Sequence, residues 1–229
     1  MPSMRKLIEN GDLAGVKRAV QDDAALLDAA VTTANDTPLM WAICKSFGAD
    51  FSIAQWLVKR GANLDVQTSE GATALMLACR RDRPGMAQML IKRGAKLDLQ
   101  NNFGWTSLMW ACRNDQPDTV QLLIERGAKL DLQNNKGNTA LMLACQQPEE
   151  SLHSAARLLR CIKLCCAAGA ALELKNDDGK DALAVAKDEN RADAVAFLEF
   201  ATMLEVARGM QGKLQQPRSV VAASLLLKT

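Results

Sequence analysis

The sequence predicts an all-α solenoid of stacked helix-turn-helix units with short hairpin tips. Two series of glycines recur at a spacing of 33 residues, Gly71, Gly104 and Gly137, and Gly61, Gly94 and Gly127. A unit of this length cannot bury its own apolar face, so each copy must pack on the next. Function is therefore expected on an exposed surface rather than in a deep cleft.

Each clear copy contains the signals for two short helices. In the copy at 68–100, TSEGATALMLACRRDRPGMAQMLIKRGAKLDLQ, the Thr73 hydroxyl is suited to cap an apolar helix. Pro84 favours the start of a second helix, and Gly94 supplies the left-handed residue that ends it. The copy at 101–133, NNFGWTSLMWACRNDQPDTVQLLIERGAKLDLQ, repeats these signals, and a third begins NNKGNTALMLACQQ.

This pattern, with its G-x-T-x-L-x-x-A start, resembles the ankyrin repeat. The family's T-P-L-H-x-A motif has a His that ties neighbouring hairpins together by hydrogen bonds. Methionine replaces it at all four corresponding positions, Met40, Met76, Met109 and Met142. The resemblance therefore implies apolar packing at this position, and the methionine row is interpreted as core rather than as a cofactor site.

On this resemblance the chain divides into caps, repeats and a tail. The expected segments are amino-terminal capping helices (1–33), a repeat with a three-residue insertion (34–67), two regular repeats (68–100 and 101–133), a repeat with a nine-residue insertion (134–175), a degenerate capping repeat with an extended helix (176–210) and a tail (211–229). The shorter insertion is placed near residues 45–50. The longer one follows Gln147 and is expected to extend a helix toward its start, because apolar residues there keep helical spacing.

Composition narrows the classes of function. A formal charge of +2 is too small for a dedicated nucleic-acid binder, so no nucleic-acid partner is expected. Apolar runs are too short for a signal peptide or a membrane span, which favours a cytoplasmic protein without membrane insertion. The cysteines are odd in number, seven, which argues for reduced thiols. Three of them recur with the repeat and are expected to fill helix contacts: Cys79, Cys112 and Cys145.

The resemblance also implies a binding surface. In ankyrin repeats the hairpin tips and the exposed positions of the first helix form a concave face, where partners usually bind. Carried over by position, the candidate partner-binding residues are Arg80, Arg81, Asn102, Phe103, Trp105, Arg113, Asn114, Asn135, Lys136 and Asn138. Phe103 and Trp105 flank Gly104 and are the expected anchors, because aromatic residues and Arg dominate binding hot spots. The alternative is that Trp105 packs over its own neighbouring hairpin.

Other aromatic and charged residues are assigned a structural role or have a structural alternative to binding. Trp41 and Trp110 fall inside the first helix at a normally apolar position, so they are assigned to packing. The cluster of Arg80, Arg81 and Arg83 could receive an acidic peptide. Because Asp82 interrupts it, a solvated charged turn is the alternative.

Catalysis finds little support in the sequence. The one histidine, His153, lies in the longer insertion, and the nearby Cys161, Cys165 and Cys166 have helical spacing without C-x-x-C geometry. No Gly-rich phosphate loop or metalloprotease motif occurs. No catalytic residue, cofactor or metal is therefore assigned, and a small Cys/His enzyme is the remote alternative.

The leading hypothesis is a non-catalytic protein-protein interaction module, a scaffold that binds a protein partner through the concave face. An alternative is a secreted bacterial effector that uses the stack to bind a host protein in the host cytosol. In that case the tail at 211–229 would serve export, since its leucines near the end resemble carboxy-terminal signals of such effectors. Packing on the last repeat and disorder are the other interpretations of this tail.

Overall fold

The structure is a computed structural model that describes residues 3–45, 51–146 and 152–211. Within these ranges it contains twelve α-helices, a 3-10 helix and no strand, as expected for an all-α solenoid. The chain forms two compact units, residues 1–107 and 108–229, here called unit 1 and unit 2. Each unit is a series of helix pairs joined by hairpin loops.

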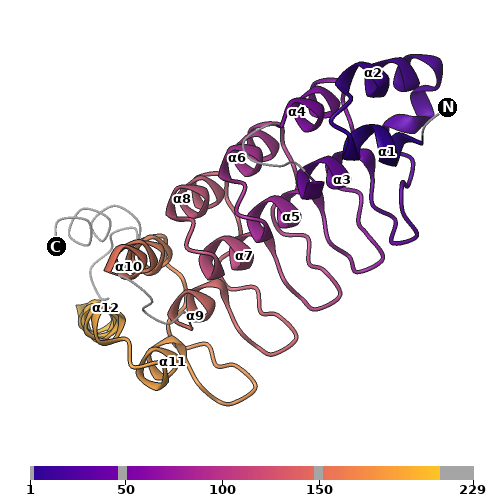
Figure 1. The fold of residues 1–229 in the computed structure, drawn as a ribbon. Helices are drawn as coiled ribbons and strands as arrows, with labels where there is room; N and C mark the ends of the chain where they lie inside the picture. Colours follow the sequence, from indigo (N-terminus) through magenta and orange to yellow (C-terminus); the bar gives the residue numbers. More distant parts are fainter. Residues whose placement is uncertain (1–2, 46–50, 147–151, 212–229) are drawn as a thin grey trace. The chain divides into compact units, whose positions relative to one another are not determined.

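Unit 1 contains the amino-terminal pair and the next two pairs. Its helices are α1 (Met4–Glu9), α2 (Leu13–Asp22), the 3-10 helix η1 (Ala24–Leu27), α3 (Pro38–Lys45), α4 (Ser52–Lys59), α5 (Ala74–Arg80) and α6 (Pro84–Lys92). Figure 1 shows α1, α3 and α5 in one row beside the hairpin loops, with α2, α4 and α6 in a second row. Helix α3 contacts α1, α4 and α5, so the first helices form the continuous layer of this unit.

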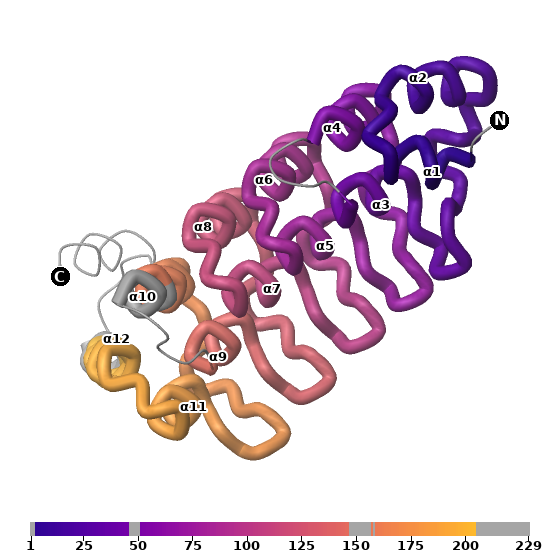
Figure 2. The backbone as a smooth tube through the Cα atoms, viewed as in Figure 1, coloured from indigo at the N-terminus to yellow at the C-terminus, as the bar shows by residue number. Residues whose placement is uncertain are grey.

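Unit 2 begins at the second residue of α7. Its helices are α7 (Ser107–Arg113), α8 (Pro117–Glu125), α9 (Ala140–Cys145), α10 (Leu152–Ala167), α11 (Ala182–Asp188) and α12 (Ala192–Gln211). The tube in Figure 2 follows α10 beside α8, α9 and α12, all of which it contacts. Helix α10 has 16 residues where α8 has nine, which agrees with a second helix lengthened toward its start.

Some expectations concern residues outside the described ranges. The three-residue insertion near 45–50 falls on residues 46–50, and the first residues of the longer insertion are 147–151. Nearly all of the tail at 211–229 lies outside as well. His153 belongs to α10, and its side chain is also outside the described part.

Threonine side chains cap the first helices, as the sequence predicted. The Thr73 hydroxyl accepts a hydrogen bond from the backbone N–H of Met76 at 3.3 Å, and Thr139 accepts one from Met142 at 3.3 Å. Each bond satisfies one of the amide donors that the first turn of a helix leaves unpaired. The caps therefore fix where α5 and α9 begin, and hence which side chains face the neighbouring pair.

The methionine row is core. Met40 is fully buried, and Met76, Met109 and Met142 are each 1% exposed. Burying such a side chain contributes about 1.5–3 kcal/mol relative to leaving it in water. Apolar packing thus occupies the position where the motif otherwise has a hydrogen-bonding His, as predicted.

A glutamine side chain links two neighbouring hairpins within each unit. Gln67 Nε2 donates to the Gln100 carbonyl at 3.2 Å, and Gln133 Nε2 donates to the Lys175 carbonyl at 2.9 Å. The same amide nitrogens also donate within their own tips, at 2.7 and 2.6 Å. A Gln just before each tip is visible in the sequence, but its role as a link between hairpins is shown only by the structure.

Candidate protein-binding surface

The hairpin tip around Gly104 holds its two aromatic residues in a fixed frame. Asn101 Oδ1 accepts from the backbone N–H of Phe103 at 3.0 Å and of Trp105 at 2.9 Å. Phe103 is 58% exposed, and Trp105 is half-buried. A backbone held by its own hydrogen bonds presents these side chains without a large ordering cost on binding.

Asn102, the next candidate, has a structural role. Its Nδ2 donates to the Ser69 carbonyl at 2.9 Å, and its backbone N–H donates to the Glu70 carbonyl at 2.9 Å. Asn102 therefore joins the tip that carries Phe103 to the preceding tip within unit 1. Asn102 is exposed, but its side-chain amide already donates a hydrogen bond within unit 1.

The candidates in unit 2 divide into exposed and buried residues. Arg113, Asn135 and Lys136 are exposed, and Asn114 is half-buried. Asn138 is only 6% exposed, and its Oδ1 accepts from Asn176 Nδ2 at 2.9 Å inside the hairpin layer. Asn138 is consequently removed from the candidate surface, because a partner could reach its amide only by breaking this buried bond.

A cavity of about 310 Å³ opens on the first-helix face of unit 1, and we call it the Trp41 cavity. Its walls include Trp41, Cys44 and Lys45 of α3, Leu77 and Arg80 of α5, and Arg81 at the end of α5. The two preceding tips complete it, with carboxylates from Asp36 and Glu70. The sequence-based set contained Arg80 and Arg81 but missed the α3 wall.

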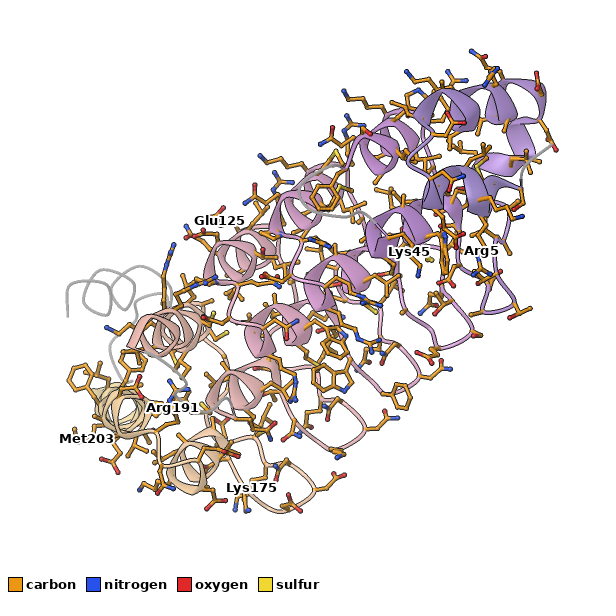
Figure 3. The ribbon with its side chains drawn as sticks, in the orientation of Figure 1. Arg5, Lys45, Glu125, Lys175, Arg191 and Met203 are labelled. Atoms are coloured by element: carbon orange, nitrogen blue, oxygen red, sulfur yellow. The ribbon has the colours of Figure 1, made fainter. Side chains whose placement is uncertain are left out.

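Trp41 was assigned to packing, and this assignment is only partly right. The indole is half-buried, and two cations lie over it: Arg5 Cζ is 4.7 Å and Lys45 Nζ is 4.8 Å from the ring centroid. Figure 3 labels both cations, which come from α1 and α3. Two cations therefore contact the face of the Trp41 ring, and the ring also lines the cavity, whereas the sequence predicted only an apolar contact.

The thiol in this cavity is shielded rather than activated. Partial burial raises the pKa of Cys44 above its ordinary value, and the neighbouring Arg81 guanidinium offsets part of this effect by favouring the thiolate. Cys44 is half-buried, whereas Cys79 in the same unit is fully buried. Access to the Cys44 sulfur thus depends on whether the cavity is filled.

Four of the five thiols of unit 2 are buried, and Cys166 is half-buried. Cys112 Sγ lies 3.8 Å from Cys165 Sγ, and both residues are at most 1% exposed. Burial raises the pKa of Cys145 to about 12 and raises that of Cys161 further. A depressed pKa is what a nucleophilic Cys needs, so Cys161 lacks the property that the remote Cys/His enzyme alternative required. Within the described residues no cluster of three or more His, Cys, Asp or Glu side chains could hold a metal ion.

Unit 2 uses several charged side chains for internal contacts. Arg191 is fully buried and makes two 3.2 Å bonds to the Asp193 carboxylate at the start of α12. Cations of α10 pair with carboxylates of the preceding helix pair, Arg157 with Asp115 at 3.5 Å and Arg160 with Asp118 at 3.0 Å. No described helix of either unit is both long enough and apolar enough to span a bilayer.

The fold and the exposed tips define a helical-repeat interaction protein. The family model for ankyrin repeats in three copies matches residues 5–101 and 85–160. The chain belongs to the ankyrin-repeat family, and as such it is a protein-interaction module.

Solved structures agree with this assignment. A chain from the structure of the predatory endopeptidase Bd0816 of Bdellovibrio bacteriovorus in complex with the immunity protein Bd3460 is 30% identical, with a TM-score of 0.70 over 87% of this chain and 98% of that chain. The ankyrin-repeat protein EF0377 is 27% identical, with a TM-score of 0.74 over 86% and 96% of the two chains. An ankyrin repeat domain of Acinetobacter baumannii AYE, ABAYE2397, shares the fold at 24% identity, with a TM-score of 0.76 over 87% and 97%. No curated protein matches the sequence significantly.

Proposed function

We propose that the chain binds a protein partner through the concave face of its repeats, with Phe103 and Trp105 as anchors. The observation that carries this proposal is the 58% exposure of Phe103 on a tip whose backbone is held by Asn101. A large aromatic side chain gains most when a partner covers it, and a fixed tip lowers the ordering cost of that step. Arg80 and Arg81 are exposed in the same unit and extend the surface.

A solved structure similar to this chain supports a protein as the class of partner. The 30% identical chain comes from a complex of two proteins, an endopeptidase and its immunity protein. A protein partner is therefore the class we propose for this chain, acting without catalysis by the module itself. Arg113, Asn114, Asn135 and Lys136 form the proposed contribution of unit 2.

The test is the affinity for a partner captured from the native cytosol. Truncating Phe103→Ala together with Trp105→Ala should weaken binding at least about fivefold, because even one hot-spot aromatic typically contributes more than about 1 kcal/mol. The matched control is Phe200→Ala on α12, which removes a comparably exposed ring, 39% exposed, from a second helix. Equal affinity of the double variant and the wild type would remove the proposed anchors.

A further inference from the structure

We infer that the Trp41 cavity receives a carboxylate side chain from an acidic segment of the protein partner. This inference rests on the proposed function, since it assigns a chemistry to a partner bound on the same face. In this inference, the acidic side chain binds between α3 and α5, at a place separate from the tip that carries Phe103.

The cavity is a feature of a single unit. All of its lining residues fall between Ala34 and Arg81, inside unit 1. Its volume of about 310 Å³ lies at the lower end of the roughly 300–1,000 Å³ typical of ligand pockets. A space of this size is large enough to admit an acidic side chain.

Charge gives the cavity its preference. Lys45, Arg80 and Arg81 supply three cations to the walls against two carboxylates, Asp36 and Glu70. Asp36 keeps its charge, and its Oδ2 accepts from the Thr32 hydroxyl at 2.6 Å within its own tip, so the cations outnumber the carboxylates by one. An incoming carboxylate therefore meets cations on the helix walls, where charge-assisted hydrogen bonds are available.

The indole brings two of the nearby cations together. Arg5 and Lys45 each lie within 5 Å of the Trp41 centroid, so they are held within about one Debye length of each other, roughly 10 Å at 0.1 M salt. Arg5 is already paired with Glu9 at 3.0 Å, so Lys45 is the cation over the ring whose charge an anion beside the ring would offset. Trp41 Nε1 is also buried without an acceptor among the described residues, and a carboxylate beside the ring supplies one.

A direct binding experiment tests the inference. The probe is a fluorescein-labelled oligoglutamate peptide, and the reference is an oligoglutamine peptide of the same length. Fluorescence anisotropy on the full chain should show binding of oligoglutamate alone. Arg81→Gln and Lys45→Gln should each weaken it about tenfold, whereas Lys92→Gln, an equal charge change at the exposed end of α6, should leave it unchanged.

Cys44 reports whether the peptide occupies the cavity itself. In a Cys166→Ser background, Cys44 is the half-buried cysteine that remains, while the other five are buried. Oligoglutamate should slow the alkylation of Cys44 by iodoacetamide, as read by mass spectrometry of the peptide that contains it. Binding without protection of Cys44, or an equal loss in Lys92→Gln, would overturn the inference, because the contact would then be a general surface attraction.

Three further outcomes separate the possibilities. If an oligothymidylate protects Cys44 better than oligoglutamate does, the cavity reads nucleic-acid phosphates and the inference is wrong. If oligoglutamate fails to bind while the captured partner still depends on Phe103 and Trp105, the cavity assignment fails and the proposed function stands. If oligoglutamate binds through Arg81 while the captured partner ignores Phe103 and Trp105, the anchors fail and the cavity assignment stands.

Discussion

The two units build the same helix pairs but use their charges differently. In unit 1, Lys45 lies over Trp41 on the wall of an open cavity. In unit 2, Arg160 of α10 reaches Asp118 of α8, and Arg191 is buried against Asp193. These cations of unit 2 are paired within their own chain, and this difference supports the proposal that the cavity of unit 1 receives an acidic side chain.

The two units also differ in the exposure of some of their cysteine side chains. Cys44 in unit 1 lines the cavity at half exposure, whereas Cys112 and Cys165 of unit 2 touch at 3.8 Å in the core. Cys165 lies on α10, which packs on both α8 and α9. Cys44 lies outside the repeated cysteine position, whose member in unit 1, Cys79, is fully buried like Cys112 and Cys145.

The largest expected effect concerns the contact between neighbouring hairpins. A Cβ added at Gly137 would lie 2.8 Å from the backbone of Asn176, and one added at Gly71 would lie 2.9 Å from the Asn102 backbone nitrogen. We expect Gly137→Ala and Gly71→Ala to lower the free energy of unfolding by about 3 kcal/mol or more in urea titrations, since backbone strain adds to the clash. The matched control is Gly179→Ala, which has a similar φ of 73° and open space around it, and should cost about 1–2 kcal/mol. Similar losses for Gly137→Ala and Gly179→Ala would show that hairpin contacts are loose in unit 2.

The next effect is alkaline destabilisation. Burial raises the pKa of Cys79 in unit 1 and of Cys145 in unit 2 from the ordinary 9.0 to about 12. Above about pH 9 these thiols ionise in the unfolded chain but stay protonated in the folded one, so the unfolded state binds fewer protons and stability falls as pH rises. Each thiol should contribute a loss of about 1.4 kcal/mol per pH unit up to about pH 12.

Urea titrations at several alkaline pH values measure this slope. Cys145→Ala should reduce it by about 1.4 kcal/mol per pH unit, and Cys79→Ala should do the same for unit 1. A slope that is identical in the wild type and both variants would contradict the burial of these thiols.

The smallest effect is that of the exposed ion pairs of α10. Arg160 and Asp118 are joined at 3.0 Å, but their side chains are 50% and 70% exposed. A double-mutant cycle with Arg160→Gln and Asp118→Asn should give a coupling of about 0.5 kcal/mol or less, falling further at high salt. A coupling above about 1 kcal/mol would mean that these pairs fix α10 in place rather than only neutralise its surface.

Much of the surface was accessible to sequence reasoning because tips and first helices follow the repeat. Phe103 is exposed, as that reasoning expected, and Arg80 and Arg81 line a cavity. Asn138 was misplaced because its position in the repeat predicts exposure, whereas its actual environment depends on Asn176, 38 residues away. The assignment of Trp41 was incomplete for a similar reason, since one of the two cations over its ring, Arg5, belongs to the preceding helix pair.

The sequence by itself determined the repeat length, the helix starts at Thr73 and Thr139 and the apolar methionine row, because each depends on local spacing and on side chains within one turn of a helix. Only the tertiary structure decided that Lys45 and Arg5 share one indole, that Cys112 meets Cys165 and that Asn138 is taken by Asn176. The contacts of Arg5 with Trp41, of Cys112 with Cys165 and of Asn138 with Asn176 join residues 36 to 53 positions apart, and they depend on how neighbouring helix pairs pack. The spacing of residues along one repeat does not contain that information.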